Sequence, residues 1–394
     1  MADNTKIQPP AGRENKPHIG IFGRCNAGKS TLLNFIVGAP AAIVSPECGT
    51  TTDVVRKSYE IEGFAPAVFI DTAGIDDTSS LAAARLERTF ETIYQIDLAL
   101  IVYTRWGEPE TALAGRLAEA AVPFVVVNNI FDDADYELPP GIDPERVVAV
   151  DASSDCPNQR DQLLEAIKRT IPESSLRTPS MFEGVAGSGD TVLLICPIDR
   201  GAPAGRLILP QVQAVRELLD RGAVAVVVQP SEIGRALDAG IRPKVAVTDS
   251  QVFAEVRAAL PQEIPLTSFS ILLAAAKGDM EMYRRGLDAV DALRDGDRVL
   301  IAESCSHQVS CEDIGRVKIP TWLKEHTGKE LQFTTITGLS PLPPNLEGYA
   351  LMVQCGGCMV TRSQLRNRIR LAAAAGVPVT NYGMLIRKLR AGGK

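Results

Sequence analysis

Long apolar runs are absent from this sequence. No stretch approaches the roughly 18–20 consecutive apolar residues that a membrane-spanning helix needs. The first residues are polar and lack the apolar segment of a signal peptide. Eight cysteines among 394 residues are too few for a disulfide scaffold. We therefore expect no membrane partner and a reducing, cytoplasmic location, where paired cysteines more often bind metal or carry redox chemistry.

Basic residues are outnumbered by acidic ones, and aromatic side chains are few. The formal net charge is −7, and aromatic residues make up 5% of the chain. Surfaces that bind nucleic acid are usually basic and often studded with aromatic side chains, so we expect no nucleic-acid partner. In contrast, 45% hydrophobic and 23% charged residues describe a globular protein with a sizeable core. The length suffices for two or three domains.

A phosphate-binding motif stands near the start of the chain. The apolar run 18–23 predicts a buried strand, and the pattern over 31–36 predicts a helix. Between them lies G-x-x-x-x-G-K-S, whose backbone N–H groups cradle phosphates. The lysine of this motif contacts the outer phosphates, and the serine hydroxyl binds magnesium. The residues expected to hold the phosphates are Gly23, Asn26, Ala27, Gly28, Lys29, Ser30 and Thr31.

Two further stretches match the switch segments of a GTPase. Thr51 lies where a first switch would stand, and we expect it to be the second protein ligand of magnesium beside Ser30. The apolar run 68–70 predicts a strand that ends in D-x-x-G. Asp71 would hold magnesium through water, and the Gly74 N–H would sense the terminal phosphate. The expected catalytic residues are Lys29, Thr51, Asp71 and Gly74.

The base of the nucleotide is expected to bind after a strand over 124–127. Translation-factor-type GTPases carry N-K-x-D there, with the aspartate reading the guanine edge. Asn129 and Asp132 match this motif, while Ile130 replaces the lysine whose stem covers the base. A strand over 147–150 and the following Ala152 resemble the last base-binding loop. We therefore predict that the site binds GTP and GDP, with a lower affinity than in GTPases that keep this lysine.

The phosphate loop resembles that of potassium-stimulated, dimer-activated GTPases. Members of this branch carry an asparagine where Asn26 stands, and its side chain helps to hold a monovalent cation beside the phosphates. Ile75 follows D-x-x-G, where Ras-like proteins place a water-orienting glutamine. We expect slow intrinsic hydrolysis that K⁺ stimulates.

Cysteines gather near the other end of the chain. Cys355 and Cys358 form a C-x-x-C with two intervening glycines, and Cys305 and His307 add a thiol and an imidazole. Strands are predicted before both groups, and parallel strands would bring their thiols to one sheet edge. Such a set fits a metal or iron–sulfur site. The C-x-x-C alone also fits a redox pair, a zinc half-site or two unrelated core thiols.

The fold class expected is α/β throughout. Apolar runs alternate with helical patterns in the middle of the chain, which favours a small parallel sheet. The strands expected there cover 191–196, 223–228, 244–248 and 266–269, and the helices 211–220, 231–238, 251–260 and 270–277. The expected organisation is a disordered tail (1–16), a P-loop GTPase domain (17–172), a linker (173–189), a small parallel α/β domain (190–290) and a C-terminal α/β domain with the cysteines (291–394).

The combination of these motifs resembles the HydF family, the GTPases used in maturation of FeFe-hydrogenase. Residues 202–210, 312–320 and 381–383 are similar to stretches of that family. Its cluster signature is C-x-H, a spacer of about fifty residues, then H-C-x-x-C. The matching residues are Cys305, His307, Cys355 and Cys358, while Gln354 stands in place of the second histidine.

The resemblance implies a 4Fe-4S cluster held by Cys305, Cys355 and Cys358. The fourth iron position would be exchangeable, with His307 or Glu312 as its candidate ligand. It also implies a scaffold that receives a transient di-iron precursor from radical maturation enzymes and delivers it to apo FeFe-hydrogenase. GTP hydrolysis would regulate the exchange of partners, and the middle domain would form a homodimer.

Two rival interpretations remain open from the sequence. A closed zinc site of three cysteines and His307 would make the chain a GTPase with a structural zinc module, acting in translation or tRNA processing. Alternatively, Cys355 and Cys358 would be the dithiol of a redox enzyme.

Overall fold

The computed structural model describes most of the chain. The described residues are 16–37, 55–60, 66–76, 82–130, 138–154, 156–176, 180–198, 207–304, 314–338 and 340–390. They form two compact units, Met1–Thr178 and Pro179–Lys394, whose boundary lies inside the segment expected as a linker. None of the helices in these ranges is both long and apolar enough to cross a bilayer.

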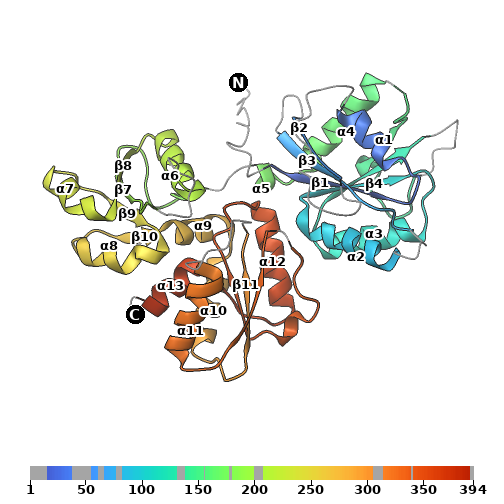
Figure 1. Cartoon of the computed structure of the whole chain (residues 1–394). Helices are drawn as coiled ribbons and strands as arrows, with labels where there is room; N and C mark the ends of the chain where they lie inside the picture. Colours follow the sequence, from blue (N-terminus) through green and yellow to red (C-terminus); the bar gives the residue numbers. More distant parts are fainter. Residues whose placement is uncertain are drawn as a thin grey trace. The chain divides into compact units, whose positions relative to one another are not determined.

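The first unit is built on a six-stranded sheet with the order β2-β3-β1-β4-β5-β6, in which only the edge strand β2 is antiparallel to its neighbour. Helices α1 and α4 cover one face and α2 and α3 the other (Figure 1). The strands are β1 (His18–Gly23), β2 (Val55–Glu60), β3 (Pro66–Asp71), β4 (Leu98–Tyr103), β5 (Phe124–Asn129) and β6 (Val147–Val150). The helices are α1 (Lys29–Val37), α2 (Ala82–Thr92), α3 (Glu108–Glu119), α4 (Pro157–Thr170) and the short α5 (Glu173–Leu176).

The central strands of this sheet are buried on both faces, as continuous apolar runs require. Each strand predicted from the sequence in this unit is present, so the strand–loop–helix setting of the phosphate motif is confirmed. Their carboxyl ends lie at one edge, where ligands bind in open α/β sheets.

The middle of the chain forms a second, four-stranded sheet with the order β10-β9-β7-β8, parallel throughout. This confirms the small parallel α/β sheet. Helices α6 and α9 pack on one face, and α7 and α8 on the other. The strands are β7 (Thr191–Ile195), β8 (Val224–Val228), β9 (Val245–Thr248) and β10 (Leu266–Ser268). The helices are α6 (Leu209–Asp220), α7 (Ile233–Asp238), α8 (Phe253–Ala259) and α9 (Phe269–Lys277).

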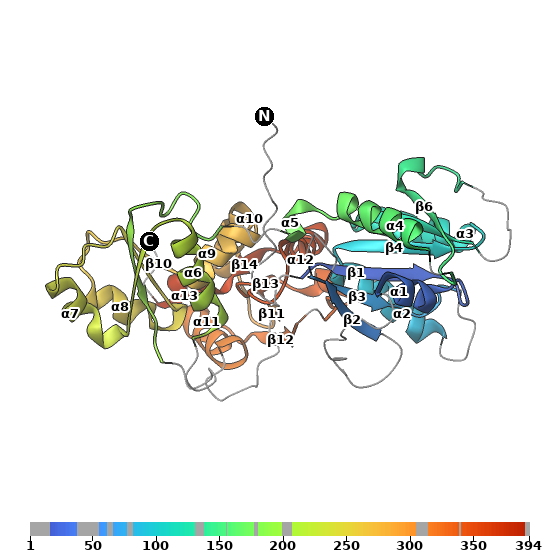
Figure 2. The same ribbon diagram turned by 90° about the horizontal axis from the view of Figure 1, so that it is seen from above.

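The end of the chain forms a third, parallel sheet with the order β12-β11-β13-β14, which Figure 2 shows in that order. Helix α12 packs on one face, and α11 and α13 on the other. The strands are β11 (Arg298–Ala302), β12 (Gln332–Ile336), β13 (Leu351–Gln354) and β14 (Val379–Asn381), and the helices are α10 (Met280–Val290), α11 (Ile319–Thr327), α12 (Arg362–Ala374) and α13 (Tyr382–Arg390). The edge strand β12 was not predicted, because its sequence QFTTI has no apolar run.

Candidate functional site

The phosphate loop joins β1 to α1 in a backbone shape that its sequence requires. A Cβ on Gly23 would lie 2.3 Å from the carbonyl oxygen of Val102 on β4, so only glycine fits there. Asn26 and Gly28 have positive φ angles, 61° and 85°. Such values are rare for residues other than glycine and asparagine. The loop therefore turns tightly back toward the N-terminus of α1.

Lys29 is the first residue of α1, and its side chain lies over the loop. The exposed fraction is only 8%, and Nζ donates to the carbonyl oxygens of Gly23 at 3.1 Å and Arg24 at 2.7 Å. Burial lowers the pKa of its ammonium group. The charge therefore stands at the mouth of the loop, where phosphates would meet it.

Ser30 and Asp71 bring the phosphate loop and β3 together. Ser30 Oγ donates to Asp71 Oδ2 at 2.6 Å. The other carboxylate oxygen, Oδ1, is buried and has no hydrogen-bond partner within the described part of the chain. A hydroxyl beside a carboxylate with an unsatisfied oxygen is a donor set that suits Mg²⁺. Thr51, the other expected ligand, lies outside the described residues.

Asn129 connects three loops at the edge of the sheet. From the end of β5, its Nδ2 donates to the Ala27 carbonyl at 2.9 Å, and its Oδ1 accepts from the Ala152 N–H at 3.2 Å. The structure thus brings together three residues that the sequence assigned to nucleotide binding. Asp132 lies outside the described residues.

Gly74 and Thr31 complete the predicted set. A Cβ on Gly74 would lie 2.3 Å from Cys25 Sγ, so the D-x-x-G turn touches the phosphate loop directly. The Ile75 N–H donates to the Gly23 carbonyl at 3.1 Å. Thr31 is exposed in the first turn of α1.

Sequence reasoning missed an ion pair beneath the phosphate loop. Arg24 donates through Nε and Nη2 to the two carboxylate oxygens of Glu110, each at 2.8 Å. The Glu110 side chain is fully buried in the first turn of α3 and also accepts from the Gly107 N–H at 3.0 Å. Its partner is 86 residues away in the sequence, and no local pattern signals such a contact.

The second candidate site lies where β11 and β13 end. The two strands are hydrogen-bonded neighbours, with Ala302 opposite Gln354. Cys355 follows β13 directly and is 8% exposed, and its Sγ accepts from the Ser304 N–H at 3.0 Å. The residue after Ser304 is Cys305, which with His307 and Glu312 lies outside the described residues.

Gln354, which replaces the family's second histidine, is fully buried. Its Nε2 donates to the Ala302 carbonyl at 3.1 Å and to Ser304 Oγ at 3.0 Å, and it lies 3.7 Å from Cys355 Sγ. This side chain therefore braces the ends of β11 and β13 beside the Cys355 sulfur.

Cys358 follows a tight turn and faces the apolar core of the middle sheet. Gly357 has φ 70°, a conformation that favours glycine. Burial, and then the neighbouring Cys355, raise the pKa of the Cys358 thiol to about 11. Thiolates bind metal, so such a thiol needs a cation to release its proton.

Two cationic side chains are buried near Cys355–Cys358, which we call the cysteine loop: Lys277 contacts the loop itself, and Arg368 contacts the residue after β11. Lys277 Nζ donates to the carbonyl oxygens of Gly357 and Val360, each at 2.9 Å. Arg368, 5% exposed, donates through Nη1 to the Glu303 carbonyl at 3.3 Å. A thiolate site held by amide N–H groups and flanked by buried cations suits an anionic iron–sulfur cluster. Within the described residues, no three His, Cys, Asp or Glu side chains form a metal-binding group.

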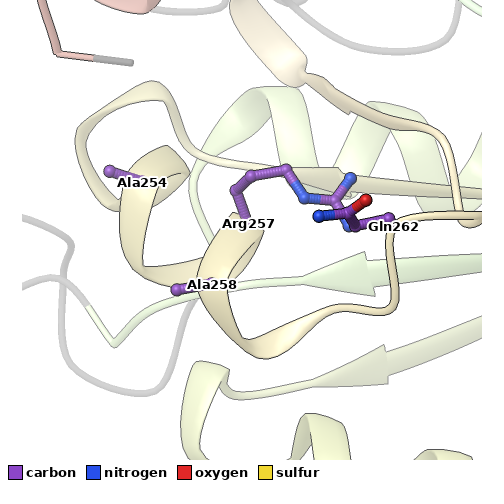
Figure 3. A pocket seen from close by; sticks show the side chains of 4 residues that line it. All are labelled: Ala254, Arg257, Ala258 and Gln262. Carbon is purple, nitrogen blue, oxygen red and sulfur yellow. The ribbon is translucent and has the colours of Figure 1, made fainter. Parts of the chain in front are cut away.

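Figure 3 shows a pocket elsewhere in the second unit, lined by Ala254, Arg257, Ala258 and Gln262. The Arg257 guanidinium donates to the carbonyl oxygens of Ile264, Leu260 and Pro261. The four lining residues include no carboxylate, thiol or imidazole. This pocket therefore suggests no chemistry.

Three family models match the chain. Residues 18–130 match "50S ribosome-binding GTPase", 181–278 match "Hydrogen maturase F dimerization domain", and 281–392 match "Hydrogen maturase F tetramerization domain". The first covers β1 to β5 of the phosphate-loop unit, and the other two cover the middle and C-terminal sheets in turn.

Curated relatives match the first unit. The tRNA modification GTPase MnmE of Azoarcus sp. (strain BH72) is 40% identical over 118 residues, which are 29% of this chain and 26% of the relative. GTPase Der of Campylobacter hominis is 38% identical over 133 residues, 32% of this chain and 28% of the relative. The chain thus spans about a quarter of these relatives.

Solved structures are less similar. The G domain of the T. maritima FeoB iron transporter is 16% identical with a TM-score of 0.28, and covers 39% of this chain and 99% of that one. Era in complex with MgGDPNP and a segment of 16S ribosomal RNA is 19% identical with a TM-score of 0.31, and covers 54% and 93%. The first unit is therefore identified as a GTPase domain by its sheet, its phosphate loop and its family match.

Proposed function

The chain belongs to the HydF family of hydrogenase maturation GTPases, and from this premise we propose that it is a GTP-hydrolysing scaffold for FeFe-hydrogenase maturation. It binds a 4Fe-4S cluster and a transient di-iron precursor, and it hands the precursor to the apo-hydrogenase. The observation that carries the proposal is the pairing of β11 with β13, because it directs Cys355 and the chain leading to Cys305 to one sheet edge.

In the GTPase site, Lys29 and the loop N–H groups bind the phosphates, and Ser30 and Asp71 hold Mg²⁺ together with Thr51. Support comes from the buried, unsatisfied Asp71 Oδ1 next to Ser30 Oγ. Asn129, Asp132 and Ala152 hold the guanine, while the Gly74 N–H senses the terminal phosphate. Asn26 helps to bind K⁺ beside the phosphates. When bound, magnesium and potassium would supply positive charge beside the phosphates as hydrolysis proceeds.

In the cluster site, Cys305, Cys355 and Cys358 would hold the cluster, with His307 or Glu312 as the candidate fourth ligand. When bound, the cluster offers an exchangeable iron to which an incoming group can attach. The Ser304 N–H and the Gln354 amide orient the Cys355 sulfur, at 3.0 and 3.7 Å. Such contacts outside the ligand shell tune a cluster's affinity and potential.

The dimerization and tetramerization domain matches indicate that the protein oligomerises. We assign a homodimer to the middle sheet. Its edge strand β8 carries Val224 and Val227, which are 53% and 44% exposed, and α6 adds Leu219 at 61%. Such an edge invites pairing with a second copy. The other partners are the radical maturation enzymes and the apo-hydrogenase, and the location is the cytoplasm.

The test is metal analysis of full-length protein purified without oxygen. Iron, acid-labile sulfide and zinc are measured, and an EPR spectrum is recorded after dithionite. About four irons and four sulfides per chain with a reduced-cluster signal are expected. One zinc without sulfide would overturn the scaffold proposal and favour a GTPase with a structural zinc module. Lys29→Ala should abolish GTP hydrolysis and keep the iron, because the two sites lie in different units.

A further inference from the structure

Lys277 is a charged side chain in a buried place. It is the last residue of α9 and is only 1% exposed. Lysines are almost never fully buried unless their ammonium is hydrogen-bonded. Its Nζ lies 2.9 Å from the carbonyl oxygens of Gly357 and Val360, and 3.5 Å from that of Cys358. One ammonium group therefore hydrogen-bonds to backbone carbonyls on both sides of Cys358.

Helix α9 belongs to the middle sheet but also forms a wall of the cysteine loop. Its Phe269, Leu272 and Leu273 lie in the core of the middle sheet, together with the partly buried Cys358. A Cβ on Gly356 would lie 3.4 Å from Leu273 Cδ1, so the loop packs directly on this helix.

A second contact joins the start of α9 to the C-terminal sheet. Ser270 Oγ donates to Asn381 Oδ1 and accepts from the Gly383 N–H, each at 3.2 Å. The residues matched as a dimerization domain end at 278, and those matched as a tetramerization domain begin at 281. Both contacts cross that boundary.

The position of the ammonium gives it an electrostatic effect on the sulfur atoms. Its Nζ lies 3.5 Å from the Cys358 carbonyl oxygen, so a positive charge stands within the turn that carries this cysteine. Charges in a buried site are screened far less than charges in water. Reduction of a bound cluster adds one negative charge, so a fixed cation nearby stabilises the reduced form more than the oxidised form.

We propose that Lys277 is a positioning residue of the cluster site, which holds the Cys355–Cys358 turn from the dimerisation domain and raises the reduction potential of the cluster. This inference rests on the proposed cluster-binding function. The dimerisation domain would therefore help to build the cluster site as well as the dimer.

The experiment compares the full-length wild type with Lys277→Met and Lys277→Gln after anaerobic reconstitution with iron and sulfide. Loss of iron to a chelator and an EPR-monitored titration with dithionite are measured. Lys277→Met should lose iron several-fold faster and favour the oxidised cluster at least tenfold, a shift of 59 mV for one electron. Lys277→Gln removes the charge, so its reduction potential should shift as in Lys277→Met. Its amide can still donate to the carbonyls, so it should lose iron more slowly than Lys277→Met.

Lys388→Met is the matched control. This lysine lies in the same unit, and its Nζ also donates to a carbonyl, that of Leu287 at 2.9 Å. It should behave like the wild type. Unchanged potential and iron retention in both Lys277 variants would overturn the inference, as would an equal shift in Lys388→Met. If circular dichroism shows that Lys277→Met is unfolded, Lys277→Gln alone tests the inference, and an unchanged reduction potential in that variant would overturn it. A wild type without iron and sulfide would instead overturn the proposed function itself.

Discussion

Arg24 and Glu110 join the phosphate loop to α3 through two parallel hydrogen bonds of 2.8 Å each. The carboxylate is fully buried, whereas the Arg24 side chain is 36% exposed. The pair raises the pKa of the guanidinium, since the hydrogen bonds to Glu110 favour its charged form. These hydrogen bonds therefore connect Arg24 of the phosphate loop to α3, the helix that follows β4.

Replacing Arg24 should destabilise the first unit, because it leaves a buried carboxylate without its cation. Breaking a fully buried pair costs about 3–5 kcal/mol. Since water reaches Arg24, we expect Arg24→Ala to cost about 2 kcal/mol. Urea unfolding is followed by the fluorescence of Trp106 in a Trp322→Phe background, which leaves one tryptophan.

Lys168→Ala is the control for that variant, since it removes an ion pair with Glu165, whose side chain is 71% exposed. It should cost under about 1 kcal/mol. Equal stability of the two variants would show that the buried pair contributes no more than an exposed one.

Asp71→Asn should slow GTP hydrolysis on the order of a hundredfold, because in the proposed site a neutral amide would no longer balance the charge of Mg²⁺. Phosphate release at saturating GTP and magnesium measures this effect. Asp161→Asn, an exposed residue of α4, serves as the control and should keep the wild-type rate. Hydrolysis by Asp71→Asn at the wild-type rate would remove Asp71 from the magnesium site.

Exchange of potassium for sodium should slow hydrolysis clearly, since we propose that Asn26 helps to hold a monovalent cation. Its positive φ of 61° places it at the turn of the phosphate loop. Phosphate release is measured in each salt at equal ionic strength, for the wild type and for Asn26→Ala. Asn26→Ala should lose the difference between the two salts. Equal rates of the wild type in both salts would refute the role given to Asn26.

Cys355→Ser should lose most of the iron after anaerobic reconstitution, because a serine hydroxyl is a poor ligand for iron in this setting. Cys196→Ser is the matched control: this thiol is also buried in the second unit, and burial raises its pKa to about 12. It should keep its iron. Similar iron loss in both variants would point to unfolding of the unit, so circular dichroism accompanies the metal analysis.

The sequence alone determined the elements whose signals are local. The continuous apolar runs of β1 and β5 predicted buried strands, and the residue types of the phosphate loop predicted its turn and its place before α1. The parallel sheet in the middle of the chain followed from the alternation of such runs with helical patterns. Three strands were not predicted: β2, β4 and the edge strand β12. That edge strand has polar and half-buried residues, so its pairing with β11 depends on the neighbour and not on its own composition.

Only the tertiary structure decided which distant residues meet. Arg24 and Glu110 are 86 residues apart, and Lys277 and Gly357 are 80 residues apart. No spacing or motif in the sequence predicts either contact. Burial makes these contacts specific, because a charged group removed from water must find its hydrogen-bond partners inside the fold. The sequence therefore predicted the phosphate-loop and cysteine residues from their motifs. Only the packing of α3 and α9 placed Glu110 beside the phosphate loop and Lys277 beside Cys355–Cys358.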